Sequence, residues 1–312
     1  MKNPFFKILL WMAIAVVTAA SVLPNSFPDY WLIDLFAHFK LQYIFIATLL
    51  LVATRFVLAH KKSAYLLLVI SIGWNSFYIA PYYFSSQPEL PKHSETFKLT
   101  SLNLLSTNPR TDLVKDYINR ENPDILILLE FTPEWENELE AFISRYPHRK
   151  LVTRTDNFGI ALLSKFEMES TVDYFNLNNK PSLIGHISIQ NTAYTLIATH
   201  PVPPIHQAAF EHRNQQLTNI LSRTSEFAKH LIIAGDFNTS SFSNHFRTLL
   251  QNEMTDSRMG FGLLPTWPAG YKAIQTTLDH CLVSKNIRVL NRTTGQSVGS
   301  DHLPISILMA ID

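Results

Sequence analysis

The chain has 312 residues, of which 16% are charged and 46% are hydrophobic, whereas an average soluble domain is about 25% charged. Only 9 residues are Gly and apolar residues are abundant, so the composition excludes disordered and fibrous chains. Cys281 is the sole cysteine, which excludes an intramolecular disulfide and a metal site built from cysteines. Residues 1–94 carry seven Lys or Arg and three acids, a net charge of +4, and the remaining 19 basic and 22 acidic residues give −3. An apolar N-terminal region therefore precedes a mildly acidic domain.

Three long apolar runs occupy the N-terminal region. They are Phe5–Leu23, Leu41–Ala59 and Ser63–Phe84, and each approaches the ~20 residues that a helix needs to cross a bilayer. Buried helices of a soluble domain are the alternative, but so short a region offers no partner large enough to cover three such runs. The sequence predicts a membrane region over residues 1–84 with three transmembrane helices, and a short interfacial helix over Tyr30–His38.

Basic residues predict the orientation of these spans. Lys2 and Lys7 precede or begin the first run, and Arg55, Lys61 and Lys62 surround the tight connection between the second and third. The positive-inside rule puts both sets on the cytoplasmic side, so three crossings place the rest of the chain on the opposite side. A cleaved signal peptide in place of the first span is the alternative, and it leaves this orientation unchanged. Residues 85–95 are polar with two prolines and are predicted to be a linker.

Residues 96–312 form one predicted domain in which strands outnumber helices. Short apolar runs such as Asp124–Glu130 are typical of strands buried on both faces. The predicted strands are Phe97–Leu105, Asp124–Glu130, Arg149–Thr153, Phe158–Ser164, Ser182–Gln190, Tyr194–His200, His230–Ala234, Thr277–Ser284, Ile287–Leu290 and Leu303–Met309. The predicted helices are Thr111–Arg120, Pro133–Arg145, Gln207–Lys229 and Asn244–Leu250. This pattern favours two packed sheets flanked by helices, of class α/β or α+β, and does not determine the strand order.

Polar residues capable of binding metal recur at the ends of these strands. Strand ends hold side chains rigidly beside a cleft, so we expect function to concentrate there. The residues are Asn103, Glu130, His200, Asp236, Asn238, Asp279 and the pair Asp301–His302.

The strings around these residues resemble the endonuclease/exonuclease/phosphatase superfamily, whose DNase I-like members include nucleases, neutral sphingomyelinases and inositol phosphatases. They are Ser-Leu-Asn103, Leu-Leu-Glu130, Phe158-Gly-Ile-Ala-Leu-Leu-Ser164, Ala-Thr-His200-Pro, Gly-Asp236-Phe-Asn238, Thr-Leu-Asp279-His and Ser300-Asp301-His302, in the family's order. The resemblance implies a four-layer αββα sandwich of two mainly antiparallel sheets that hydrolyses phosphoesters. The three-span front and Pro265-Thr-Trp-Pro268 resemble a membrane-anchored bacterial branch, which implies the bacterial inner membrane with the catalytic domain on its periplasmic or extracellular side.

Two of these residues suit a hard divalent cation. Asn103 and Glu130 offer oxygen ligands for Mg²⁺ or Mn²⁺, and Asp301 is a further candidate ligand. The alternative for Glu130 is an acidic cap of the helix that begins near Pro133. The family's nucleases often have an acid two positions after the first Asn, and here that position is Leu105, so one ligand can be missing.

The other residues suit hydrolysis. Asp236 is expected to orient or deprotonate water, and Asn238 to donate to developing phosphoryl oxygens. His302 is expected to act on the phosphate or the water with Asp279 holding its ring, and His200 to bond the phosphate or leaving group. The alternatives are an Asx turn at Asp236 and Asn238, a surface turn at Asp301–His302, and a hydrogen-bonded core histidine at His200.

Two further residues are candidates for substrate binding. Arg213 begins a long helix and is expected to reach a phosphate, with a solvated arginine as the alternative. Trp267 is expected to line the substrate mouth, with a core role as the alternative. His280 alternates with Asp279 along its strand, so it points to the other sheet face and is left outside the site.

The leading hypothesis is a membrane-anchored phosphoesterase that depends on Mg²⁺ or Mn²⁺. Proteins that bind duplex nucleic acid usually carry a basic surface, and the domain's net charge of −3 argues against stable duplex binding. This balance slightly favours a lipid-headgroup or small phosphoester substrate. An endo- or exonuclease is one alternative, and a non-catalytic membrane receptor that reuses the fold is another.

Overall fold

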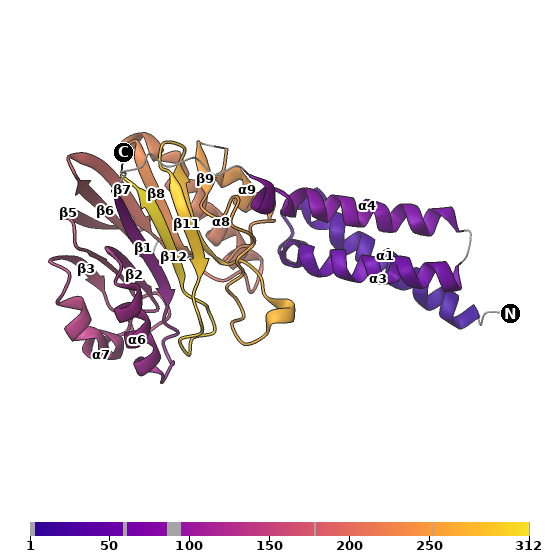
Figure 1. Cartoon of the computed structure of the whole chain (residues 1–312), viewed down its shortest axis with the longest axis horizontal. Coiled ribbons are helices and arrows are strands. Elements are labelled where there is room, and N and C mark those ends of the chain that lie inside the picture. The colour runs from indigo at the N-terminus through magenta and orange to yellow at the C-terminus, as the bar shows by residue number, and fades with distance from the viewer. Residues whose placement is uncertain (1–3, 59–60, 86–94, 178, 252, 312) are drawn as a thin grey trace.

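The structure is a computed structural model that describes residues 4–58, 61–85, 95–177, 179–251 and 253–311. A bundle of N-terminal helices projects from one side of a domain built on two sheets (Figure 1). Most of the predicted linker, residues 86–94, lies outside the described residues.

The bundle contains three long helices, α1 (Pro4–Ser26), α3 (Lys40–Val57) and α4 (Lys62–Ile79). Between α1 and α3 the chain forms two short turns of helix, α2 (Trp31–Asp34) and the 3₁₀ helix η1 (Leu35–Phe39), where the sequence predicts an interfacial helix. Among the described residues, two stretches are long and apolar enough to cross a membrane, Pro4–Ser26 and Trp31–Val57, and the helix at the third predicted span is not one of them. The predicted third span corresponds to α4, which ends at Ile79 because Pro81 starts the separate helix α5 (Pro81–Phe84).

The outer surface of the bundle is apolar. Of the 27 large hydrophobic side chains that are exposed among the described residues, 23 lie in residues 5–84. Inside the bundle, small residues such as Ala47 and Ala64 are fully buried and allow the helices to approach closely. The apolar positions of these helices therefore face outward as well as inward, which a surface helix of a water-soluble domain avoids.

The domain consists of two six-stranded sheets (Figure 1). The first has the order β11 (Val289–Thr294), β12 (Ile305–Ala310), β1 (Thr96–Asn103), β2 (Ile125–Leu129), β4 (Ile160–Ser164) and β3 (His148–Val152). The second has the order β5 (Met168–Asp173), β6 (Ser182–Ile189), β7 (Thr192–Ala198), β8 (His230–Asp236), β10 (Asp279–Ser284) and β9 (Met254–Asp256). Two pairs are parallel, β1 with β2 and β7 with β8, and the other described pairs are antiparallel.

The strand β2 shows why the apolar runs are continuous. Ile125, Ile127 and Leu129 face the core between the two sheets, whereas Leu126 and Leu128 face a second core beneath the helices. Helices α6 (Thr111–Glu121) and α7 (Pro133–Ile143) cover the first sheet, and α8 (Gln207–Ser222) and α9 (Asn244–Leu249) cover the second. The layers run helix, sheet, sheet, helix, which confirms the predicted sandwich of two mainly antiparallel sheets.

Some predicted elements have different bounds or were missed. Strands β5 and β9 have no counterpart among the predicted strands, because β5 is a polar strand at the sheet edge and β9 has three residues. The predicted helix Gln207–Lys229 ends at Ser222 and is followed by a 3₁₀ turn at Thr224–Glu226. Strand β11 runs from Val289 to Thr294, further than predicted.

A buried ion pair joins the bundle to the domain. The Asp34 carboxylate accepts a hydrogen bond from Ser243 Oγ at 2.6 Å, and its other oxygen lies 3.4 Å from Arg213 Nη2. Asp34 is 1% exposed and Arg213 is 0% exposed. Arg213 Nη1 also donates to the Asn238 carbonyl at 2.6 Å, so one guanidinium links the front of the chain to the loop after β8.

This junction predicts a large loss of stability when Asp34 is replaced. Asp34→Ala leaves the Arg213 charge buried without its partner, which typically costs about 3–5 kcal/mol. The matched control is Asp29→Ala in the same segment, since the Asp29 side chain is 85% exposed and lies 3.6 Å from His245. The free energy of unfolding of the control should change by less than about 0.5 kcal/mol. Thermal unfolding of the two variants in detergent measures the difference, and equal melting temperatures would contradict the role of the buried pair.

Candidate active site

The strand order explains why the predicted residues meet. Strands β1, β2, β7 and β8 all end at one edge of the sandwich. Strand β12 is antiparallel to β1 and strand β10 is antiparallel to β8, so β10 and β12 begin at that edge. Asp279, for example, pairs directly with Asp236 in the ladder. This edge gathers Asn103, Glu130, His200, Asp236, Asn238, Asp279 and His302.

Asp236 lies at the centre of this group. Its Oδ2 is 3.3 Å from Asn103 Nδ2, 3.5 Å from His200 Nε2 and 3.5 Å from His302 Nε2. Its Oδ1 accepts the backbone N–H of Asn238 at 2.9 Å. The residue is buried, and burial raises the pKa of Asp236, with the charge of Asp279 acting in the same direction.

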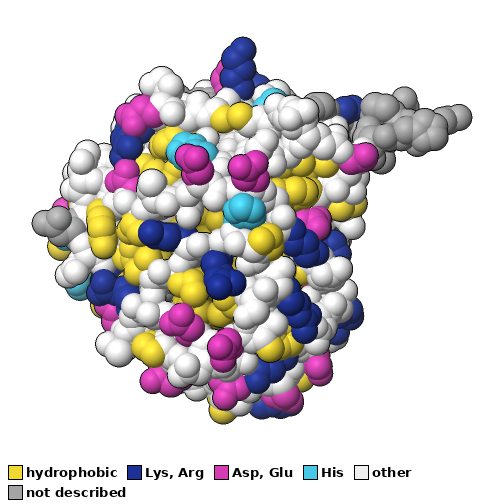
Figure 2. Space-filling model, turned by 90° about the vertical axis from the view of Figure 1, so that its left-hand side faces the viewer, with side chains coloured by type: hydrophobic (Ala, Val, Ile, Leu, Met, Phe, Trp, Pro, Cys, Tyr) yellow, Lys and Arg dark blue, Asp and Glu magenta, His cyan; other side chains and the backbone are white. Residues whose placement is uncertain are grey.

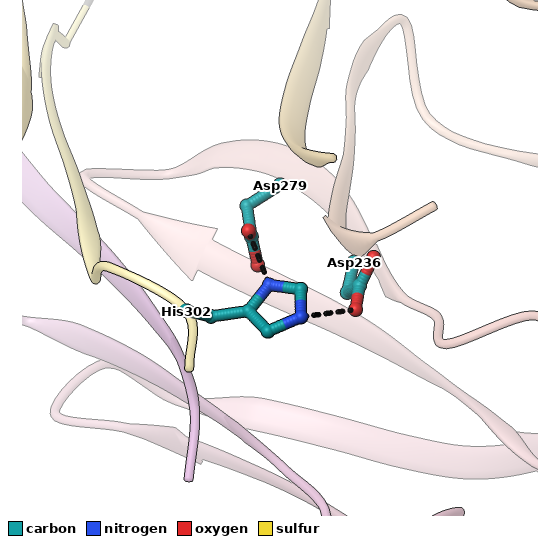
Figure 3. A group of neighbouring side chains, drawn as sticks. All are labelled: Asp236, Asp279 and His302. Atoms are coloured by element: carbon teal, nitrogen blue, oxygen red, sulfur yellow. Dashed lines mark hydrogen bonds and ion pairs between the residues drawn. The ribbon is translucent and has the colours of Figure 1, made fainter. Parts of the chain in front are cut away.

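His302 lies between two carboxylates (Figure 3). Its Nδ1 is 2.8 Å from Asp279 Oδ2, and its Nε2 faces Asp236. Burial lowers the pKa of His302, but the carboxylates of Asp279 and Asp236 outweigh burial and raise it to about 10. For Asp279, burial acts to raise the pKa, and His302 lowers it overall. The Asp279–His302 contact that the sequence predicts is therefore a charged hydrogen bond.

Glu130 and Asn103 form the second part of the site. Glu130 Oε1 accepts from Asn103 Nδ2 at 3.2 Å, and Oε2 accepts the backbone N–H of Ser106 at 2.9 Å. Glu130 has a φ of +57°, so the chain turns sharply where β2 ends. The cap of α7 is Thr132, whose hydroxyl accepts from Trp135 N at 3.3 Å, so Glu130 does not cap this helix.

These residues fit a divalent cation. The carboxylates of Glu130 and Asp236 both accept from Asn103 Nδ2, so two buried acids lie close together, whereas Asn103 Oδ1 accepts the backbone N–H of Leu105 at 3.0 Å. Asp279 adds a third buried acid, and His302 compensates only part of this charge. Buried carboxylates without cations are costly, and their oxygens are the ligands that Mg²⁺ and Mn²⁺ prefer. Asp236, Asp279 and His302 also offer ligand atoms within 4.8 Å of one another.

His200 and Asn238 line the same site. Asn238 Nδ2 donates to the Pro201 carbonyl at 2.9 Å. Burial lowers the pKa of His200, and its ring lies 5.5 Å from that of Phe158. Lys180 Nζ lies 3.3 Å from the centroid of the Phe158 ring, which brings a cation to the same side of the site. His200 and His302 both lie against Asp236, but the pKa of His200 is lowered whereas that of His302 is raised.

A cavity of about 1000 Å³ opens onto these residues. Glu130, His200, Asp236, Asn238, Trp267, Asp301 and His302 line one part of it. The rest of the cavity lining was not predicted from the sequence. It includes Trp31, Leu35, Phe39, Phe158, Lys180 and Ile205. The one sequence signal for this part is that Val202-Pro-Pro-Ile205 begins two residues after His200.

The structure corrects one predicted contact and refines others. Arg213 does not reach the cavity, because its guanidinium is buried against Asp34 and the Asn238 carbonyl. Asp301 does line the cavity, but its Oδ2 accepts from Trp267 Nε1 at 3.1 Å, and no contact among the described residues joins it to Asn103 or Glu130. His280 points away from the site, as expected, and its Nδ1 lies 2.8 Å from Arg258 Nη2.

Residues 100–302 match the model of the Endonuclease/Exonuclease/phosphatase family. The chain belongs to this family. Structures with the same fold include TDP2 from D. rerio complexed with a single-strand DNA product, at 18% identity and a TM-score of 0.59, covering 69% of this chain and 99% of that one. Another is an endonuclease/exonuclease/phosphatase from Bacteroides vulgatus, at 17% identity and a TM-score of 0.59, covering 70% and 100%. Curated protein sequences give no match.

The geometry predicts that Asp236 and His302 are essential for turnover in this family member. Asp236→Ala and His302→Ala should each lower kcat by on the order of 10²-fold or more, as loss of a positioned acid or base does. His212→Ala on the exposed face of α8 is the matched control and should keep the wild-type rate. Steady-state rates on a phosphodiester, with circular dichroism as the check on folding, make this measurement. Folded variants with wild-type rates would remove both residues from the mechanism.

Proposed function

We propose that the protein is a membrane-anchored phosphoesterase that uses Mg²⁺ or Mn²⁺ to hydrolyse phosphodiester or phosphomonoester bonds. The observation that carries this proposal is the convergence of Glu130, Asp236 and His302 at one end of a cavity. Family membership supports hydrolysis of phosphoester bonds. A non-catalytic receptor has no need for three buried acids and two histidines in one network.

Glu130 would hold the cation, and Asn103 would add a ligand once its Oδ1 turned from the Leu105 N–H towards it. When bound, the cation would neutralise charge on the phosphoryl oxygens. Asp236 Oδ2 is placed to accept a proton from water, and burial raises the pKa of Asp236, which makes this carboxylate a stronger base. His302, held at Nδ1 by Asp279, presents Nε2–H to the substrate oxygens, and Asn238 adds an amide donor. His200 is placed to bond the phosphate or the leaving group. Water adds to phosphorus and the ester P–O bond breaks.

The substrate class follows from charge and shape. The domain is mildly acidic, and on the face turned away from the helices basic and acidic side chains are interspersed (Figure 2). The net charge of −3 and the presence of Lys180 as the one Lys or Arg among the described residues that line the cavity do not suit long nucleic acid, whose binding depends on many phosphate contacts with Lys and Arg. A nuclease activity is the second candidate, because TDP2 from D. rerio, complexed with a single-strand DNA product, has the same fold. A lipid-headgroup or small phosphoester substrate fits the charge better.

The exposed apolar surface of the bundle supports a position in the membrane. The N-terminal end of α1, the end of α3 and the start of α4 lie together, away from the domain (Figure 1). Lys7, Arg55, Lys61 and Lys62 belong to these segments, so the described basic residues of the bundle, apart from Lys40, gather at the end opposite the domain. The positive-inside rule would place this end in the cytoplasm and the domain on the periplasmic or extracellular side of a bacterial inner membrane.

The metal role predicts a specific effect of Glu130→Gln. This change keeps the size of the side chain and removes the negative charge that a hard cation needs. We expect the Mg²⁺ concentration for half-maximal activity to rise by about tenfold or more, since even residues that only support ligands are often worth about 10- to 100-fold. Excess Mg²⁺ should partly restore the rate. Glu134→Gln on the exposed start of α7 is the matched control, and a Glu130→Gln titration that superimposes on it would reject the ligand assignment.

The orientation predicts the side of the membrane on which the C-terminus lies. A reporter enzyme that is active only outside the cytoplasm, fused after Ala310, should be active in cells. The same reporter fused after Lys62, at the opposite end of the bundle, should be inactive and serves as the control. Activity only from a reporter that requires the cytoplasm, when fused after Ala310, would reverse the proposed orientation.

A further inference from the structure

The cavity beside the catalytic residues has a second wall, formed by the segment between the first two membrane helices. Trp31, Leu35, His38 and Phe39 line it, at positions i, i+4, i+7 and i+8 of the consecutive helical turns of α2 and η1. Residues with this spacing share one face of a helix. On the neighbouring face, Leu32 and Phe36 are 57% and 52% exposed and do not line the cavity. The segment thus presents to the cavity a stripe that is apolar except for His38, and it presents another apolar stripe outward.

The opposite wall is also apolar and begins at the catalytic centre. Val202, Pro203, Pro204 and Ile205 line the cavity, and only Pro201 separates them from His200 in the sequence. Gln207 fixes this loop to the first wall, because its amide donates to the Asp29 carbonyl at 3.1 Å and accepts from Trp31 N at 3.3 Å. One cavity therefore runs from Asp236 and His302, between two apolar walls, to the segment that enters the membrane helices.

The domain's exposed apolar residues gather at this junction. Among the described residues 95–311, four large hydrophobic side chains are exposed, and Ile205, Tyr271 and Ile274 are three of them. Ile205 lies in the loop that Gln207 ties to α2, and Gln42 of α3 donates to the carbonyls of Ala273 and Gln275 on either side of Ile274. The part of the domain nearest the apolar bundle is thus the part that carries exposed apolar side chains.

We propose that these two walls form a binding subsite for the acyl chain of a phospholipid that enters the active site from the membrane. The inference rests on the proposed phosphoesterase function and names its substrate class. A phosphoester at the polar end of the cavity would place an attached tail between Leu35 and Ile205. Its phosphate would meet Lys180, the single Lys or Arg among the described residues that line the cavity. One cation suits one phosphate, whereas a nucleic-acid strand needs a series of them.

A series of alkyl p-nitrophenyl phosphodiesters tests the subsite. Hydrolysis with water releases p-nitrophenol and an alkyl phosphate, and the alkyl group is lengthened from methyl to dodecyl. Each CH₂ that enters an apolar site is worth about 0.8 kcal/mol, or about fourfold. For the full chain in detergent micelles with Mg²⁺, we expect kcat/KM to rise by about two- to fourfold per CH₂ until the walls are filled. Thymidine 5′-p-nitrophenyl phosphate, with the same leaving group, should be a poorer substrate than the dodecyl ester.

Longer esters also partition more strongly into micelles, and this effect is the same for all variants. Substitutions in the two walls therefore show how much of the chain-length dependence comes from the subsite. Leu35→Asn and Ile205→Asn should each flatten the dependence of kcat/KM on chain length. The matched controls are Leu32→Asn on the same helical segment and Ile274→Asn at the same junction, because neither residue lines the cavity. Both controls should keep the wild-type slope. Ile205 is 71% exposed, so its substitution tests the wall even where Leu35→Asn reduces folding.

The outcomes distinguish this inference from the proposed function. Hydrolysis of every ester at a rate independent of chain length would reject the acyl subsite and leave the phosphoesterase intact. Wall variants that keep the wild-type slope, or a clear preference for the thymidine ester, would also reject the subsite. Absence of hydrolysis for all the esters, together with no release of phosphate from phosphatidic acid in the same micelles, would reject the phosphoesterase itself.

Discussion

The Asp236 carboxylate is the group on which the site depends. It is buried at the end of β8, and an amide, two histidine rings and a backbone N–H all point at its oxygens. A buried carboxylate is stable only when such partners surround it, and here each partner comes from a different strand end. In this αββα sandwich the parallel pairs β1–β2 and β7–β8 end on the same side. Their antiparallel neighbours β12 and β10 begin on that side, so the partners of Asp236 meet there. Loss of β1, β7 or β12 would in each case remove one of these partners of Asp236.

The same centre is connected to the N-terminal region through Arg213. Its guanidinium contacts Asp34 in the bundle segment and the Asn238 carbonyl in the loop after β8. Asn238 in turn donates its backbone N–H to Asp236. Burial lowers the pKa of Arg213, and Asp34 opposes this effect, so the pair keeps a buried charge compensated. The N-terminal helical region therefore helps to position the site. The Asp34–Arg213 ion pair holds in place the cavity wall that this region contributes.

Local pattern in the sequence predicts most of the fold and the contents of the site. The runs that became β2, β4 and β8 are recognisable because both faces of each strand are buried, and the polar residues after them mark the site edge. Strand order depends on pairing between distant segments, which local pattern does not contain. The motif resemblance supplied the layer arrangement instead.

The wrong prediction for Arg213 and the missed apolar walls have a common physical cause. Arg213 has the sequence context of a solvated helix residue, and only Asp34, 179 positions away, shows that it is buried. The apolar walls were missed because the predicted interfacial helix around Trp31–Phe39 and the loop Val202–Ile205 form one cavity only when the N-terminal helices dock on the domain. Residues that act alone at a strand end are visible in the sequence. Surfaces built from two distant segments are not.

The central claim is that Asn103 and Glu130 hold a divalent cation beside Asp236, and direct binding tests it without reference to substrate. Mn²⁺ is added to the purified full chain, and electron paramagnetic resonance measures the Mn²⁺ that remains free. The difference between added and free Mn²⁺ gives the number of bound ions. The account predicts at least one tightly bound Mn²⁺ per wild-type chain, retained in Glu134→Ala and lost in Glu130→Ala. A wild-type chain that binds no Mn²⁺, or a Glu130→Ala variant that binds it as tightly as wild type, would contradict the account.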